Sequence, residues 1–198
     1  MKCLTEREKH QSTLAKNCQK PVNCRKNLLK KRGKAVNTVL SGDTIKKLIN
    51  EGKIVIEPYD ENLIGAVSID LRLGNQALNP DSGKEISLVD YHLSLDEFLL
   101  ANTIERVTLP DNLVARIIPR SSLARLGILV TLDADLLPPN YSGKPLLTMK
   151  NLSKKPVLMR SGLAVCQLLF EQVDKSIKGY RSRYDHTKPE ASKLEEVT

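Results

Sequence analysis

Short apolar runs, separated by proline, glycine and polar residues, make up most of the chain after about residue 38. In the clearest run, Val67, Ile69, Leu71 and Leu73 alternate with polar or small residues, which predicts a β-strand with one apolar face. Residues 74–75, Gly-Asn, are expected to form the turn that ends it. Further strands are predicted over residues 54–56, 98–101, 104–109, 113–118, 128–130, 146–149, 157–159 and 164–173. Many short strands at this spacing indicate an all-β sandwich or a barrel-like domain.

One short helix is predicted before the first strand. Ser41 is a good N-cap residue, and Ile45, Leu48 and Ile49 would then share one apolar face of the helix. Gly52 is expected to end it.

A second short helix is predicted directly after the run at residues 113–118. Pro119 should end that strand, because proline has no N–H to give to a sheet. Ser121 or Ser122 is then expected to cap a helix that Gly127 ends.

The start of this second helix carries candidate chemistry. Free helix N–H groups, the hydroxyls of Ser121 and Ser122, and the guanidinium groups of Arg120 and Arg125 would together form an anion site suited to phosphate. The residues alone leave a second interpretation open, a surface helix with solvated arginines.

The formal net charge of +8 is unevenly distributed over the 198 residues. Residues 1–37 hold 11 basic and 2 acidic side chains, a net charge of +9, whereas the rest holds 20 and 21. Residues 1–37 are therefore predicted to be a basic, disordered tail, and residues 188–198 a second disordered segment. Any contact with nucleic acid is expected through the basic tail alone.

The cysteines point to a reduced environment. Cys166 lies in an apolar run and is predicted to be a buried thiol. Cys3, His10, Cys18 and Cys24 match no standard zinc spacing, so no zinc is expected. No apolar run reaches the roughly 20 residues of a membrane span, and no signal segment is recognised at the start. A cytoplasmic protein is the expectation.

Several motifs, taken in order, resemble those of dCTP deaminases in the dCTP deaminase/dUTPase superfamily. The most specific is Pro-Arg-Ser-Ser-Leu-Ala-Arg-Leu-Gly at residues 119–127, which resembles the phosphate-binding motif of that family. The others lie at residues 40–45, 54–58, 68–75, 141–143, 167–171 and 180–184, the last resembling the tail that closes over the nucleotide.

The resemblance implies a dUTPase-like β-sandwich or β-clip domain over residues 38–187, assembled as a homotrimer with sites between subunits. It implies binding of dCTP or dUTP, with Mg²⁺ accompanying the triphosphate, and hydrolytic deamination of dCTP to dUTP. The positions that match the nucleotide-binding residues of the family are Arg120, Ser121, Ser122, Leu123, Ala124, Arg125, Ala134, Leu147, Tyr180, Arg183 and Thr187.

The reacting side of the site departs from the family pattern. Family deaminases use a glutamate to activate the water that attacks C4 of cytosine, and that position here is Thr148. A supporting aspartate is replaced by Pro138, and Thr187 stands where glutamine is usual. A hydroxyl with a pKa far above neutral cannot replace a carboxylate base unaided.

Two other carboxylates are candidates for a role at the site. Asp135 flanks Ala134 and is the candidate substitute base, although a plain loop carboxylate is the alternative. Asp70 could join a magnesium shell or instead bond to nearby backbone or to Arg72. Two hypotheses therefore remain open: a dCTP deaminase, or a catalytically silent relative that binds a nucleotide or a protein partner in a regulatory role.

Overall fold

The computed structural model describes residues 38–132, 134–178, 189 and 191, which belong to a compact unit spanning residues 37–198. Its helical elements are α3 (Gly42–Asn50), the 3-10 turn η1 (Glu61–Leu63) and α4 (Ser121–Arg125). The strands of the first half are β1 (Val55–Glu57), β2 (Ser68–Asn79), β3 (Lys84–Ser87), β4 (Tyr91–Leu93), β5 (Phe98–Thr103) and β6 (Arg106–Thr108). Those of the second half are β7 (Leu113–Pro119), β8 (Ile128–Leu129), β9 (Leu136–Leu137), β10 (Ser142–Gly143), β11 (Leu146–Asn151), β12 (Val157–Met159) and β13 (Ala164–Gln172).

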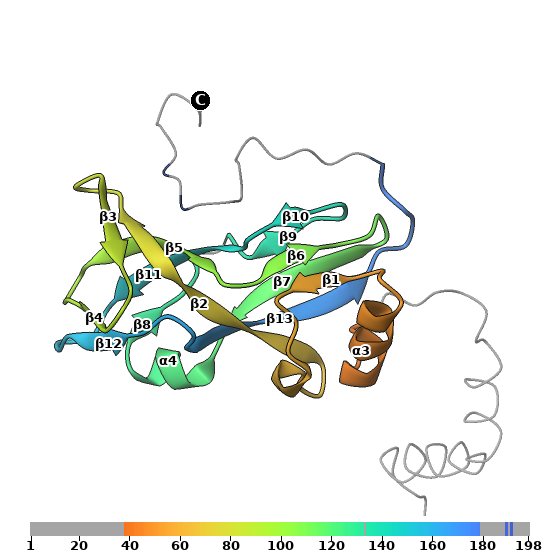
Figure 1. Ribbon diagram of the computed structural model, residues 1–198, viewed down its shortest axis with the longest axis horizontal. Coiled ribbons are helices and arrows are strands. Elements are labelled where there is room, and N and C mark those ends of the chain that lie inside the picture. The colour runs from red at the N-terminus through yellow and green to blue at the C-terminus, as the bar shows by residue number, and fades with distance from the viewer. Residues whose placement is uncertain (1–37, 133, 179–188, 190, 192–198) are drawn as a thin grey trace, which may run out of the picture. The chain divides into compact units, whose positions relative to one another are not determined.

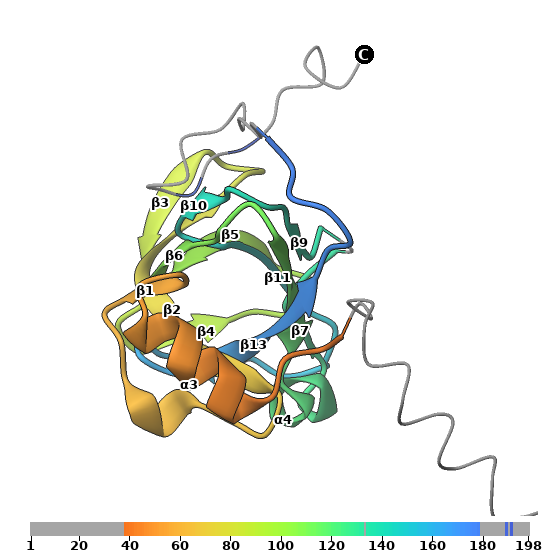
Figure 2. The ribbon, with the colours of Figure 1, turned by 90° about the vertical axis from the view of Figure 1, so that its right-hand side faces the viewer.

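Within the described residues, the strands form three antiparallel sheets. The largest has the order β8-β11-β5-β2-β13-β7-β9, with β3 paired to β2. A second sheet has the order β1-β6-β10, and β12 pairs with β4. The sheets curl around one core, and α3 and α4 lie on their outside (Figures 1 and 2). The predicted all-β fold with a short helix before the first strand is confirmed.

Aliphatic side chains fill the core. Leu71 on β2, Leu147 on β11 and Phe170 on β13 are fully buried. Cys166 is also fully buried, as predicted, and burial, together with the nearby carboxylates of Glu105 and Asp70, raises the pKa of its thiol.

The predicted start of the first helix is confirmed. Ser41 is the N-cap of α3, and its hydroxyl accepts a hydrogen bond from the backbone N–H of Thr44 at 3.4 Å. Ile45 is fully buried, while Leu48 and Ile49 pack against the core from a half-buried position. The single apolar face of this helix is therefore what fixes it to the sheets.

The predicted turn at residues 74–75 is wrong, because β2 runs through it to Asn79. The pairing of β2 with β5 shifts register between Leu73 and Ala77, which marks an irregularity within the strand rather than its end. A Cβ atom on Gly74 would come within 2.7 Å of the Asn102 carbonyl oxygen. Glycine is needed here because a neighbouring strand approaches closely, not because the chain turns.

The predicted face of β2 also needs one correction. Ile69, Leu71 and Leu73 are buried as expected, but Val67 is 46% exposed. The strand begins only at Ser68, so Val67 belongs to the preceding loop and takes no part in the alternation.

Other predictions concern segments outside the described residues. The disorder of residues 1–37 and of most of residues 188–198 stays a prediction. In the part of the chain that the structure describes, no helix is long and apolar enough to cross a membrane.

Candidate functional site

The segment around α4 begins differently from the prediction. Arg120, not Ser121 or Ser122, is the N-cap of α4, with an extended backbone and no side-chain cap bond. The carbonyl oxygen of Arg120 accepts the N–H groups of Leu123 and Ala124 at 3.1 and 3.2 Å. The two serines therefore lie one and two residues inside the helix, with exposed side chains.

The first turn of α4 still leaves polar groups available. The first N–H groups of a helix have no acceptor within it, and both serine hydroxyls are exposed. Ala124 is exposed as well, whereas Leu123 is buried and anchors the helix to the core. The serine side of the turn therefore exposes hydroxyl and N–H donor groups.

Arg120 forms an ion pair with Asp70 that the sequence did not reveal. Asp70 lies on β2 opposite Gln167 of β13, and Gln167 lies opposite Ile118 of β7, so the pair crosses β13. The side chains are 39% and 23% exposed, respectively. The backbone N–H of Arg120 also donates to the Val165 carbonyl at 3.1 Å, which ties the start of α4 to β13.

The contact with Arg72, one of the alternatives predicted for Asp70, is not formed. Arg72 instead pairs with Glu105, whose carboxylate accepts the Nε–H of Arg72 at 2.6 Å and its backbone N–H at 2.8 Å. Glu105 is 1% exposed, so Arg72 supplies the bonds that this buried carboxylate needs. One carboxylate oxygen of Asp70, Oδ2, is in turn held by Arg120.

Arg125 differs from Arg120 in its exposure and in its ion pairing. It is exposed at the last turn of α4, and it forms no ion pair with any described residue. Gly127 ends the helix with φ +80°, as predicted, and its carbonyl oxygen accepts the N–H of Leu152 at 2.8 Å. The free cation of the segment is therefore Arg125, held in place by a fixed helix end.

Thr148 lies on β11, opposite Leu100 of β5. Its hydroxyl oxygen accepts the backbone N–H of Leu132 at 2.7 Å, and the residue is partly exposed. Leu147, the neighbouring candidate, is fully buried in the core on the opposite face of the strand. The side chain of Leu147 therefore does not lie on the Thr148 side of the strand.

Asp135, the candidate substitute base, is bound to an arginine. One of its carboxylate oxygens accepts from Nη2 and Nε of Arg116 at 3.1 and 3.3 Å. Ala134 beside it is exposed, and Pro138 is half-buried, with its carbonyl oxygen accepting the N–H of Tyr141 at 3.1 Å. No contact between Asp135 and Thr148 is seen among the described residues.

The two elements that carry most of the candidate site residues, α4 and β11, are connected through β8. The chain passes from α4 into β8, and β8 pairs with the end of β11, with Leu129 opposite Lys150. Thr148 and the α4 segment are thus placed by neighbouring elements. Tyr180, Arg183 and Thr187 lie outside the described residues, as do Cys3, His10, Cys18 and Cys24.

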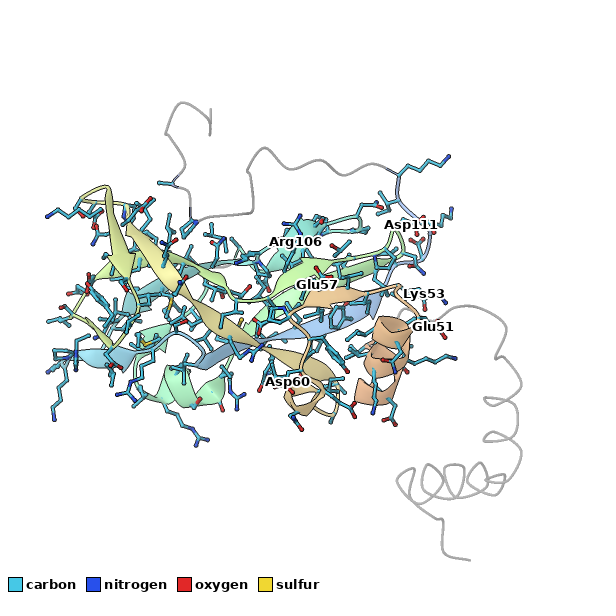
Figure 3. All side chains as sticks on the ribbon, viewed as in Figure 1. Glu51, Lys53, Glu57, Asp60, Arg106 and Asp111 are labelled. Carbon is cyan, nitrogen blue, oxygen red and sulfur yellow. The ribbon has the colours of Figure 1, made fainter. Side chains whose placement is uncertain are left out.

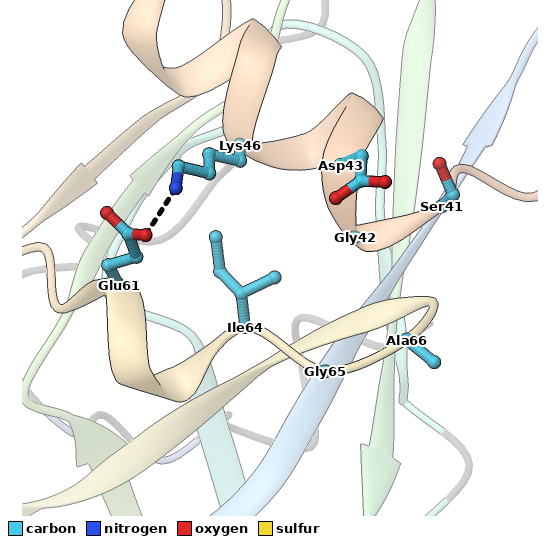
Figure 4. Close-up of a pocket in the computed structure, with 8 residues that line it drawn as sticks. All are labelled: Ser41, Gly42, Asp43, Lys46, Glu61, Ile64, Gly65 and Ala66. Atoms are coloured by element: carbon cyan, nitrogen blue, oxygen red, sulfur yellow. Dashed lines mark hydrogen bonds and ion pairs between the residues drawn. The ribbon is translucent and has the colours of Figure 1, made fainter.

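Two pockets of the described residues lie away from this site. One, of about 350 Å³, opens at the start of α3, where Lys46 and Glu61 form an ion pair across it (Figure 4). The other, of about 430 Å³, is lined by residues of α3, the loop before β7 and Gln172, and includes Lys53 and Asp111, which Figure 3 shows at that end of the molecule. Neither pocket contains a residue of α4 or β11.

Comparison with known proteins identifies the family. In fold, the chain is similar to the crystal structure of 2'-deoxycytidine 5'-triphosphate deaminase from Agrobacterium tumefaciens, with a TM-score of 0.60 and 23% identity over 69% of this chain and 48% of that one. The described fold is thus of the same structural class as that protein, although the match spans only about half of its length.

Sequence relatives are more similar. The chain is 37% identical over 183 residues to "dCTP deaminase, dUMP-forming" of Dictyoglomus thermophilum, covering 79% of this chain and 94% of the relative. A protein of the same name from Methanosphaera stadtmanae is 35% identical over 186 residues, covering 80% and 94%. A family model for dCTP deaminase-like proteins matches residues 39–173. The chain belongs to the dCTP deaminase-like family, a family of nucleotide metabolism, as its motifs predicted.

Proposed function

We propose that this protein binds a pyrimidine deoxynucleoside triphosphate, dCTP or dUTP, and that its deaminase activity is weak or absent. The triphosphate would lie against the start of α4 and Arg125, and the base would lie toward Thr148. Mg²⁺ would arrive with the triphosphate and be held by its phosphate oxygens, since Asp70 is paired with Arg120.

One observation carries the proposal. At the position of the family glutamate, Thr148 presents a hydroxyl whose oxygen accepts the N–H of Leu132 at 2.7 Å. Hydrolytic deamination requires a group that takes a proton from the attacking water, and a threonine hydroxyl has no such basicity near neutral pH. Thr148 can therefore still form a hydrogen bond at this position, but it cannot serve as the catalytic base.

Other carboxylates near the site are already engaged. Asp135 binds Arg116, Asp70 binds Arg120, and Glu105 binds Arg72. To act on a substrate water, each of these carboxylates would have to share or give up its arginine partner. None of the three supports a replacement for the missing glutamate.

The names of the relatives define the products to look for. They are called dUMP-forming, and conversion of dCTP to dUMP requires loss of both the 4-amino group and diphosphate. An active form of this protein would therefore release dUTP or dUMP, and both must be resolved.

The oligomer belongs to the same proposal. We propose a cytoplasmic homotrimer, on the family resemblance, with each nucleotide site completed by a neighbouring subunit. A mass corresponding to one chain at micromolar concentration would contradict this assembly.

Isothermal calorimetry with dCTP and dUTP in the presence of Mg²⁺ tests the binding proposal. Arg125→Ala should weaken binding about 10- to 100-fold, because a charge-assisted hydrogen bond to phosphate contributes about 1.5–3 kcal/mol. Arg160→Ala is the matched control, since Arg160 is an exposed arginine that pairs with Asp90 away from α4. Equal affinity in wild type and Arg125→Ala would mean that the nucleotide binds elsewhere. If wild type binds neither nucleotide, the alternative hypothesis, that the protein binds a protein partner, is favoured.

A further inference from the structure

Asn102 lies on the same face of the large sheet as Thr148. In the antiparallel pairing of β5 with β11, Asn102 is opposite Leu146 and Leu100 is opposite Thr148. Side chains of directly paired residues lie on one face, so Asn102 is the diagonal neighbour of Thr148 across the two strands. Diagonal neighbours are separated by about 7–8 Å, a distance that a small aromatic ring spans.

This face is distinct from the hydrophobic core. Leu99 and Ala101 of β5, and Leu147 and Met149 of β11, point the other way and belong to the core cluster. On the Asn102 face, Leu146 and Thr148 are partly exposed. Asn102 therefore lies on the same face as two partly exposed side chains, while its own amide atoms are covered.

The carboxamide of Asn102 lacks hydrogen bonds. The residue is 6% exposed, and neither Oδ1 nor Nδ2 has a partner among the described residues. Buried amides are almost always bonded, and leaving one unpaired is unfavourable. Asn151 shows the usual arrangement, with its Nδ2 donating to the carbonyls of Leu93 and Lys155 at 2.9 and 2.8 Å and its Oδ1 accepting the N–H of Ser153 at 2.8 Å.

We propose that Asn102 binds the edge of the pyrimidine base of the nucleotide, whether cytosine or uracil; this inference rests on the proposed function. A carboxamide offers one donor group and one acceptor. The cytosine edge presents a 4-amino donor beside the N3 acceptor, and the uracil edge presents the O4 acceptor beside the N3–H donor. Rotation of the amide by 180° about its last bond exchanges donor and acceptor, so Asn102 fits either base.

Binding of the base and binding of the triphosphate can be measured separately. Asn102 should contribute to affinity for dCTP and dUTP but not to affinity for inorganic tripolyphosphate, which has no base. Arg125 should contribute to all three. A merely structural role for Asn102 would not produce this difference, because a misfolded site would lose all three ligands together.

The test is calorimetric titration of full-length wild type and Asn102→Leu with dCTP, dUTP and tripolyphosphate, each with Mg²⁺. We expect the variant to bind both nucleotides about ten-fold more weakly, as for one lost hydrogen bond, and tripolyphosphate as well as wild type does. Asn50→Leu is the control, since Asn50 is an exposed amide on α3. Asn102→Ala, which adds no volume, should act in the same direction if leucine does not fit.

Three results would overturn the inference. Unchanged affinity of Asn102→Leu and Asn102→Ala for dCTP and dUTP would mean that the amide meets a water molecule or another subunit instead. An equal loss for tripolyphosphate would make its role structural. Failure of wild type to bind either nucleotide would refute the proposed function as well, which distinguishes it from the first two.

Discussion

Arg120 and Arg125 lie five residues apart in one motif, yet they make different interactions in the folded protein. Arg120 is paired with Asp70, while Arg125 forms no ion pair with a described residue. Arg120→Ala should therefore lower the free energy of unfolding by about 1–2 kcal/mol, because it leaves a half-buried Asp70 unpaired. Arg125→Ala should leave it nearly unchanged.

Urea denaturation of the two variants checks this difference. Asp70→Asn together with Arg120→Ala should recover part of the loss, since the uncompensated charge is gone. Equal stability of Arg120→Ala and wild type would mean that the pair contributes nothing.

Some residues of the candidate site could be predicted from the sequence, and others could not. Motif order identified the α4 segment and the substitution at Thr148, because both depend on neighbours along the chain. The partner of Asp70 was missed because the β2-β13-β7 order joins residues 50 positions apart. Asn102 follows the apolar run at residues 98–101 and precedes Thr103, so nothing in the local sequence marks it, and its environment depends on strand pairing.

At the scale of elements, the end of α4 is more sharply determined than its beginning. Gly127 has φ +80°, and an added Cβ would lie 3.0 Å from Cβ and 3.1 Å from N of Ser153. Gly127→Ala should destabilise the fold by about 1–2 kcal/mol from backbone strain alone, with crowding added. Gly162→Ala is the control, because its φ is +88° but its surroundings are open.

Thermal or urea denaturation, combined with dCTP titration, measures both effects. Gly127→Ala should lose more stability than Gly162→Ala and should also bind dCTP more weakly, because α4 would shift. An identical result for the two variants would mean that Ser153 gives way and the end of α4 is not fixed by it.

Element boundaries were predictable where a single residue type sets them. Ser41 as a helix cap and Gly127 as a residue with positive φ are both recognisable from the local sequence, and both were identified correctly. The expected cap at Ser121 or Ser122 failed because Arg120, held by β13 and Asp70, already supplies the extended backbone at that position. β9 and β10, with two residues each, were not predicted, whereas the equally short β8 was, because it lies in an apolar run directly after Gly127.

At the scale of the whole molecule, the fold class followed from the spacing of apolar runs. One compact unit spans residues 37–198, and the family match covers residues 39–173. We expect deletion of residues 1–37 to leave the melting temperature and the oligomeric mass nearly unchanged, because that segment has too few apolar residues to offset its ordering entropy.

Differential scanning calorimetry and light scattering of the shortened chain measure both properties. The control is the full-length chain at the same concentration and ionic strength. A fall of many degrees, or a changed mass, would show that the segment packs on the domain or joins the subunits.

In this account, the protein keeps a nucleotide-binding site but lacks the catalytic base, because Thr148 stands at the position of the family glutamate. The most direct measurement is chromatographic separation of dCTP, dUTP and dUMP after incubation of wild type and Thr148→Glu with dCTP and Mg²⁺. General-base catalysis contributes roughly 10²–10⁴-fold, so we predict little or no product from wild type. Some deamination should return in Thr148→Glu, although Pro138 still lacks the supporting carboxylate. Robust formation of dUTP or dUMP by wild type would contradict the account and make Asp135 the first residue to replace.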